Sequence, residues 1–296
     1  MALVDDRLPQ ATSPNPGLPP WRWYVPFLVG LGLYLVLGIF VAAFAGAAGW
    51  TGDLPDRFVL FATLLQDAAL IGLTMWVAQM SGPHARWHLG VRRTRPWRSL
   101  GLAVAAFLIF LAFLIVWQQV LGTDETDDLA QELGAEDSAF NLVAVTVLVC
   151  LAAPVAEELF FRGFLFGGLR KLPHFDWIGA AIMSGAVFGV VHAGGTDAVF
   201  LVPLAVLGIM LCWLYQKTGS LLPGMGVHAF NNAFALGATL GWEPWQVLLA
   251  VVLAPIVVVA LMSRVAVAPA RPEPPEPPAP SGPAFIPPVA PQLPAR

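Results

Sequence analysis

The chain has 296 residues, of which 57% are hydrophobic and only 11% are charged, and its mean hydropathy is +0.72. A soluble domain carries about 25% charged residues. The 15 Lys and Arg residues against 19 Asp and Glu give a net charge of only -4. This composition excludes a soluble enzyme, a nucleic-acid-binding protein and a disordered chain.

Apolar runs long enough to cross a bilayer follow one another along the chain. A spanning helix needs about 20 apolar residues. Together the runs predict an all-α fold, a polytopic membrane helical bundle of about eight transmembrane helices within 25–264, and the fifth run is the shortest. The runs cover residues 25–48, 58–80, 99–121, 140–168, 177–193, 199–216, 220–240 and 245–263.

The two ends of the chain have a different composition. Residues 1–24 are predicted to form a Pro-rich N-terminal segment. Residues 265–296 are predicted to form a disordered tail rich in proline. The first apolar run exceeds the core of a signal peptide, so it is predicted to be a retained span. Cys150 and Cys212 lie in apolar runs without metal-motif spacing, and we expect both to be buried packing residues.

The loops differ in charge, and this difference predicts the orientation. Lys and Arg stay on the cytoplasmic side. Both termini are therefore expected in the cytoplasm, with the protein in the plasma (inner) membrane. The basic residues of the even-numbered loops are Arg86, Arg92, Arg93, Arg95, Arg98, Arg170, Lys171 and Lys217. The odd-numbered loops hold Arg57 and the acidic residues Asp53, Asp56, Asp124, Glu125, Asp127, Asp128, Glu132, Glu136, Asp137, Asp197 and Glu243.

Ionisable and amide side chains inside the apolar runs are candidates for function, because a charge in the bilayer costs roughly 2.5–3.5 kcal/mol on insertion scales. Most of them lie in the second half of the chain. In the first half the comparable residue is Asp67, which we expect to be structural. The candidates are Glu157, Glu158 and Arg162 in the fourth run, His192 in the fifth, and His228, Asn231 and Asn232 in the seventh.

The fourth run carries two neighbouring carboxylates. Glu158 and Arg162 are four residues apart, so their side chains meet on one helix face and are expected to form an ion pair. Glu157 lies about 100° around the helix and must find another partner. Pro154 lacks an N–H, which frees the carbonyl of Cys150 and kinks the helix beside Glu157. A kink at membrane depth is typical of a wet cavity.

The histidines and the amide complete a candidate reaction centre. His228 and Asn232 are four residues apart and share a helix face, while His192 closes the fifth run. Taken singly, each fits a structural hydrogen bond between helices. Taken together, a spare carboxylate, two imidazoles and an amide supply what water activation needs, namely a base, ligands and an oxyanion donor.

Three motifs in chain order resemble one family. Residues 157–162 match E-E-x-x-x-R, residues 188–192 match F-x-x-x-H, and residues 228–232 match H-x-x-x-N. This pattern resembles the CPBP intramembrane proteases, which include type II CAAX prenyl proteases and bacteriocin-processing or immunity proteins. The resemblance covers a protease core of about residues 140–240, about a third of the chain.

The resemblance implies an intramembrane endopeptidase that cleaves a membrane-associated or lipidated protein or peptide. It makes Glu157 the base that activates water. It also makes His192, His228 and Asn232 catalytic, holding the water, a metal ion or the oxyanion, with Glu158 and Arg162 orienting them. Two histidines and Glu157 suit Zn²⁺ with an open water position. A metal-free glutamate mechanism is the other possibility.

Two other classes remain open on the sequence. A non-catalytic membrane immunity or scaffold protein would keep the same constellation for stability. A proton-coupled transporter would use buried Glu and His as a relay. The polar groups are confined to one half of the chain, without matching broken helices in the other, which disfavours the transporter. The expected partners are the lipid bilayer and a membrane-associated peptide or protein, with no nucleic acid.

Overall fold

The computed structural model describes residues 24–49, 55–80, 89–122, 131, 133–170, 172, 175–193 and 196–267. Within these ranges the chain is helical apart from turns, short connections and one isolated parallel bridge between Arg92 and Val267. The predicted all-α bundle is confirmed. Most of segment 1–24, the acidic residues 124–128 and residues 268–296 of the tail lie outside the described residues.

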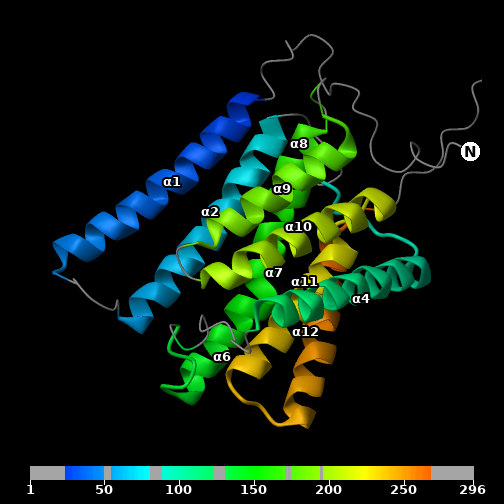
Figure 1. Ribbon diagram of the computed structural model, residues 1–296. Coiled ribbons are helices and arrows are strands. Elements are labelled where there is room, and N and C mark those ends of the chain that lie inside the picture. The colour runs from blue at the N-terminus through cyan, green and yellow to red at the C-terminus, as the bar shows by residue number, and fades with distance from the viewer. Residues whose placement is uncertain are drawn as a thin grey trace, which may run out of the picture.

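Every predicted apolar run forms a helix (Figure 1). The fifth predicted span, α9, is indeed the shortest, with 15 residues. The helices are α1 (Tyr24–Ala47), α2 (Asp56–Met80), α4 (Pro96–Leu121), a continuous helix over 139–169, α9 (Trp177–Val191), α10 (Ala198–Thr218), α11 (Leu222–Thr239) and α12 (Pro244–Val265).

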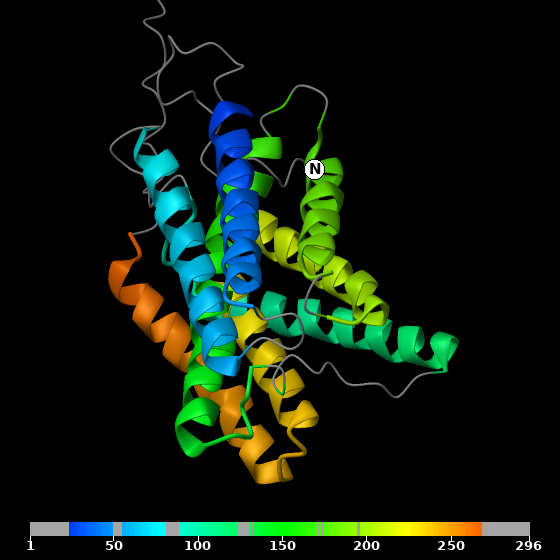
Figure 2. The same cartoon turned by 90° about the vertical axis from the view of Figure 1, so that its left-hand side faces the viewer.

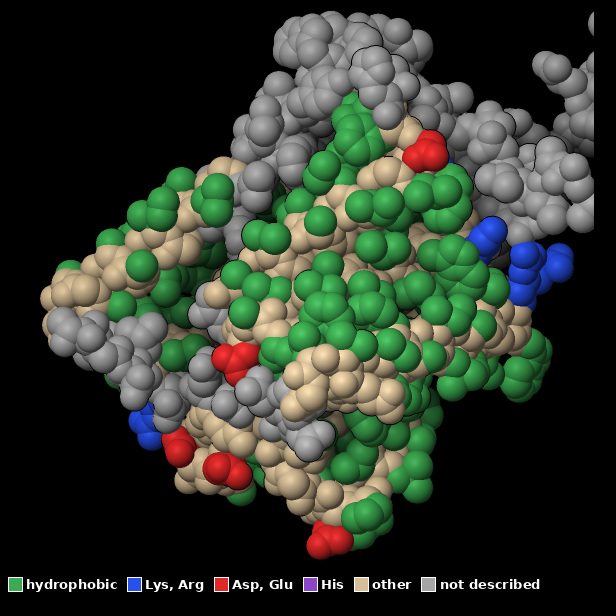
Figure 3. Space-filling view, viewed as in Figure 1, with side chains coloured by type: hydrophobic (Ala, Val, Ile, Leu, Met, Phe, Trp, Pro, Cys, Tyr) green, Lys and Arg blue, Asp and Glu red, His purple; other side chains and the backbone are tan. Residues whose placement is uncertain are grey.

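Several helices have the length and composition of a membrane span. Five such stretches occur in the described part of the chain, and α9 and the second half of α1 are shorter apolar helices. Apolar side chains are also spread widely over the described part of the face seen in Figure 3. The five stretches are Arg57–Trp76, Pro96–Leu121, Ala139–Leu169, Ala198–Thr218 and Pro244–Val265.

Local sequence signals set where the helices begin and end. The Ser138 hydroxyl accepts from the Asn141 N–H at 3.1 Å, and the Asp176 carboxylate accepts from the Gly179 N–H at 2.7 Å, so each caps the start of its helix. Glu243 and Gln246 form a capping box before α12. Gly219 ends α10 with a φ of 63°, a left-handed conformation that glycine adopts readily.

The helix over 139–169 is the axis of the bundle. It consists of α6 (Ala139–Val147), the π-helical η2 (Leu148–Ala152), α7 (Ala153–Glu157), the π-helical η3 (Glu158–Phe166) and α8 (Gly167–Leu169). Helices α2, α9, α10, α11 and α12 all pack against it. In contrast, α1 lies along α2 at the edge of the molecule, as both ribbon views show (Figure 2).

Segment 89–93 is buried although it is not helical. Leu89, Val91 and Arg92 are each at most 5% exposed. Burial lowers the pKa of the Arg92 guanidinium below its ordinary value. The segment accepts a hydrogen bond at Gly90 O from Leu221 N, and it exchanges two backbone bonds with Val267. It therefore ties the start of α11 to the residues that follow α12.

Candidate active site

The central helix changes its hydrogen-bond register just before the paired glutamates. In η2 the N–H of Ala153 bonds to the carbonyl of Leu148, five residues earlier, instead of to Val149. The next residue, Pro154, has no N–H to give. As the sequence predicted, Pro154 cannot supply the N–H that the Cys150 carbonyl would receive in a regular helix. The wider register also leaves the Val149 carbonyl without an N–H from its own helix.

Glu158 and Arg162 form the expected ion pair. Arg162 Nη1 lies 2.9 Å from Glu158 Oε1, and both side chains are at most 1% exposed. Arg162 Nη2 also donates to the Gly208 carbonyl on α10 at 3.5 Å. Because both charges are removed from water, each depends on the other, and loss of one would leave an uncompensated buried charge.

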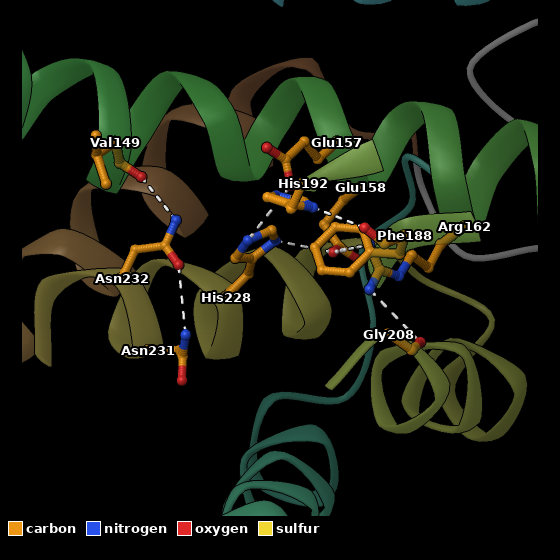
Figure 4. Close-up of polar contacts among 10 residues, drawn as sticks. All are labelled: Val149, Glu157, Glu158, Arg162, Phe188, His192, Gly208, His228, Asn231 and Asn232. Carbon is orange, nitrogen blue, oxygen red and sulfur yellow. Dashed lines mark hydrogen bonds and ion pairs between the residues drawn. The ribbon is translucent and has the colours of Figure 1, made fainter. Parts of the chain in front are cut away.

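His228 faces both carboxylates. Its Nδ1 lies 3.1 Å from Glu158 Oε1, and its Nε2 lies 3.6 Å from Glu157 Oε2 (Figure 4). The shorter contact is a hydrogen bond in which Nδ1 donates to the carboxylate, whereas 3.6 Å is too long for one. Glu157 is 16% exposed, against 3% for His228 and 1% for Glu158. Glu157 is thus the more accessible and less tightly held carboxylate.

His192 ends α9 beside this cluster. Its Nδ1 lies 2.6 Å from the Phe188 carbonyl, which can only accept, so Nδ1 carries the proton. The other ring nitrogen, Nε2, is then the one with a lone pair. His192 is half-buried, in keeping with a group that meets water or substrate.

The Phe188 ring is surrounded by the charged and imidazole groups of the site. It is fully buried, and the Arg162 guanidinium lies 4.5 Å from its centroid. The rings of His192 and His228 have centroids 4.8 Å and 5.8 Å from it. A cation over an aromatic face is attracted by the ring quadrupole. Phe188 therefore stabilises Arg162 while it packs against both histidines.

The two asparagines of α11 have different surroundings. Asn232 Nδ2 donates to the Val149 carbonyl at 2.9 Å. Asn231 Nδ2 lies 3.5 Å from Asn232 Oδ1. Asn232 therefore lies about two helical turns from the glutamates along the central helix, where its amide already has a backbone acceptor.

Two residues outside the three motifs bear on the site, and of these only Asp67, an ionisable residue inside an apolar run, had a signal in the sequence. A Cβ at Gly224 would lie 2.8 Å from Glu158 Oε2, so this carboxylate lies against α11 where there is no side chain. Asp67 is 5% exposed on the face of α2 that also buries Leu70, Thr74 and Ala78. Neither residue belongs to the three motifs.

The predicted metal ligands do not converge as a metal site. Among the described residues, which include Glu157, His192 and His228, no three His, Cys, Asp or Glu side chains have a metal-holding arrangement. His228 directs one nitrogen to each carboxylate, and His192 uses Nδ1 on a backbone carbonyl. In this arrangement the three side chains therefore do not converge as ligands of one metal ion.

Comparison with known proteins identifies the family. Residues 139–234 match the family model described as type II CAAX prenyl endopeptidase Rce1-like. The chain is 30% identical over 236 residues to Uncharacterized protein YyaK of Bacillus subtilis (strain 168), covering 72% of this chain and 76% of that protein. It is 24% identical to UPF0177 protein YxdF of Lactococcus lactis subsp. lactis (strain IL1403), covering 50% of this chain and 84% of the relative.

A third relative has a name that states an activity. Putative membrane peptidase YdiL of Bacillus subtilis (strain 168) is 26% identical, over 47% of this chain and 54% of the relative. No solved structure matches the chain at a significant level. The matched region contains all three motifs and the side chains that cluster around His228. The chain therefore belongs to the Rce1-like family of type II CAAX prenyl endopeptidases, a family of membrane proteases, and is an integral multi-pass membrane protein.

Proposed function

We propose that the protein is an intramembrane endopeptidase in which Glu157 activates the attacking water. The observation that carries this proposal is the unequal environment of the two glutamates. Glu158 is paired with Arg162 at 2.9 Å and bonded to His228 at 3.1 Å. Glu157 has the greater exposure and a contact of only 3.6 Å with His228. A general base must be free to accept a proton and must meet water, and Glu157 meets both conditions.

The proposed reaction is hydrolysis of one peptide bond. Glu157 takes a proton from a water molecule, whose oxygen attacks the carbonyl carbon while the carbonyl electron pair moves to its oxygen. When the C–N bond breaks, the leaving nitrogen receives that proton, so the products are a carboxylic acid and an amine. The Nε2 atom of His192 would hold the water, and His228 would stabilise the charges that develop. Glu158 and Arg162 orient His228.

The substrate in this proposal is a membrane-associated or lipidated protein or peptide that reaches the site from the bilayer. The apolar surface and the family support this class. The runner-up is a non-catalytic membrane immunity or scaffold protein that retains the same side chains. The Glu158–Arg162–His228 cluster would also hold the central helix to α11, and Arg162 would hold it to α10 through the Gly208 carbonyl.

Mapping of new peptide termini in membranes separates the two functions. Cells that express the wild type are compared by mass spectrometry with cells that express equal amounts of Glu157→Gln, which keeps the shape and removes the base. Glu136→Gln, at an exposed position outside the site, is the matched control. We expect termini that occur with the wild type and the control and disappear with Glu157→Gln. The same termini in all three samples would contradict the proposed protease function.

Zinc held by Glu157, His192 and His228 stays a separate prediction. Elemental analysis of purified wild-type protein and of His192→Ala tests it. One equivalent of zinc, lost in the variant together with cleavage, would support a metal enzyme. Full cleavage by protein that contains less than a tenth of an equivalent, roughly, would leave the glutamate mechanism without a metal.

A further inference from the structure

The side-chain amide of Asn232 lies against a backbone carbonyl of the central helix that accepts no N–H from its own helix. Asn232 Nδ2 donates to Val149 O at 2.9 Å, from α11 to η2 (Figure 4). In an α-helix this carbonyl would accept from Ala153, whose N–H here bonds to Leu148. The next residue is Pro154, which has no N–H. The side chain of Asn232 thus supplies the donor that the backbone lacks.

A carbonyl without a donor is costly at this place. Its neighbours Leu148 and Cys150 are each 1% exposed, and the hydrogen bond between Asn232 and Val149 is itself partly buried. An acceptor shielded from water that loses its partner carries a desolvation penalty. Inside a bilayer, an irregular helix persists where a neighbouring helix satisfies the freed backbone group. Asn232 meets that condition for the π turn and for the proline that follows it.

The same face of α11 makes a second contact with the central helix. His228, one turn before Asn232, faces Glu157 and Glu158. The rest of the π turn and Pro154 lie between the two contacts, so α11 holds the irregular segment at Val149 and again just beyond Pro154. If the Val149 contact is lost, the segment can return to a regular helix. Removal of one extra residue from a turn rotates everything beyond it by about 100° and so moves Glu157 relative to His228.

We propose that Asn232 is a positioning residue, which caps the Val149 carbonyl and thereby fixes the π turn that aims Glu157 at His228. This inference rests on the proposed function only for its effect on cleavage. It differs from the role expected from the resemblance, in which Asn232 donates to the oxygen of the reacting carbonyl. The two roles give opposite results when Pro154 is replaced.

Pro154→Ala is the diagnostic change, since it restores the N–H that the helix lacks. A helix with alanine at this position can satisfy its own carbonyls, so the Asn232 amide is no longer needed. Asn232→Leu keeps the approximate shape of the side chain and removes the donor. Ser184→Ala is the matched control: the Ser184 hydroxyl is also buried, and it donates from α9 to Phe161 O in the same central helix at 3.1 Å, away from Pro154.

Thermal unfolding of the purified full chain in detergent tests the capping. We expect Asn232→Leu alone to lower the Tm by on the order of 5 °C. In the Pro154→Ala background the same change should lower it by less than about a third of that value. Ser184→Ala should lower the Tm equally in both backgrounds. Equal losses for Asn232→Leu in the two backgrounds would overturn the proposal.

Cleavage rates test the positioning. Asn232→Leu should reduce kcat by about tenfold or more in the wild type while KM changes little. In the Pro154→Ala background, where the restored N–H makes the amide unnecessary, it should cause no further reduction. An equal fold-loss in both backgrounds would identify a donor to the reacting oxygen and overturn the proposal. If the wild type cleaves nothing, the proposed function fails, and the unfolding cycle still decides whether Asn232 caps Val149.

Discussion

The Phe188 side chain shows how an apolar residue can serve a polar site. It fills buried space and presents its π face to Arg162 at 4.5 Å. Leucine would fill most of the space without a ring, so the guanidinium would lose an interaction of about 2 kcal/mol in a desolvated site. Arg162 would then hold Glu158, and through it His228, less firmly.

We expect Phe188→Leu to lower kcat by about tenfold, which corresponds to about 1.4 kcal/mol. The control is Phe166→Leu. Phe166 is also fully buried, and it has a guanidinium, that of Arg170, 5.5 Å from its centroid. Both variants should lose similar thermal stability. If Phe166→Leu loses as much kcat as Phe188→Leu, the effect on activity comes from packing alone.

Gly224 makes room for the buried carboxylate of Glu158. A methyl group at this position would lie 2.8 Å from Oε2 and only 3.5 Å from the carboxyl carbon, Cδ. The carboxylate would have to move away from Arg162 or from His228, at a cost of about 1–3 kcal/mol.

Gly224→Ala should therefore reduce both the cleavage rate, by about tenfold, and the unfolding temperature. Gly101→Ala on α4 is the control, because a Cβ there meets nothing within 4 Å and alanine favours a helix. Cleavage of one reporter peptide and thermal unfolding are measured for both variants. Wild-type activity in Gly224→Ala would mean that cleavage does not depend on the observed position of the Glu158 carboxylate.

At the scale of the elements, α9 and α10 pack closely through small residues. A Cβ on Gly185 would lie 2.6 Å from the Ala205 carbonyl oxygen and 2.9 Å from the Ile209 nitrogen. These are backbone atoms, which cannot rotate away, so a larger residue must separate the helices. Small residues at such contacts are typical of membrane helix pairs.

Gly185→Ala is expected to destabilise the protein by about 1–3 kcal/mol and to lower cleavage, because α9 carries Phe188 and His192. Gly72→Ala on α2, where a Cβ meets nothing within 4 Å, should be neutral or slightly stabilising. Unfolding temperature in detergent is the measurement. A stable Gly185→Ala protein would show that the α9–α10 contact tolerates a wider spacing.

The helices were predictable from sequence to a large extent, and so was the Glu158–Arg162 pair. An apolar run indicates a segment that is removed from water, and a spacing of four residues indicates that two side chains share a helix face. The register of η2 was not predictable, since a π turn and an α turn have the same composition. The contact between Asn232 and Val149 was also missed, because it joins residues 83 positions apart through a backbone carbonyl.

At the scale of the whole molecule, most acidic and most basic side chains lie at different ends of the bundle. In Figure 3 most Asp and Glu side chains lie in the lower half, and most of the visible Lys and Arg lie at the right, with a further basic patch at the lower left. In the chain, Arg93, Arg95 and Arg98 follow α2, whereas Asp197 and Glu243 precede α10 and α12. The charge rule for membrane proteins predicts that the basic end faces the cytoplasm.

Reporter fusions test this orientation. A reporter active only in the cytoplasm should work when fused to either terminus, and one active only outside the cytoplasm should work when inserted after Gly122. The reverse pattern, or activity of one reporter at both places, would contradict the orientation. A reporter inserted at residue 219, in the loop after α10, is expected to give the same result as one fused to either terminus.

The backbone bonds between segment 89–93 and Val267 define how far the chain can be shortened from its carboxyl end. Val267 N bonds to Val91 O, Arg93 N bonds to Val267 O, and the Arg93 guanidinium bonds to Ser263 O. A chain that stops after Val267 retains all of these links, whereas one that stops at Leu261, still inside α12, loses them together. For crystallisation or for a fused label, residue 268 is thus the earliest position at which the native chain can be replaced without untying this end of the bundle.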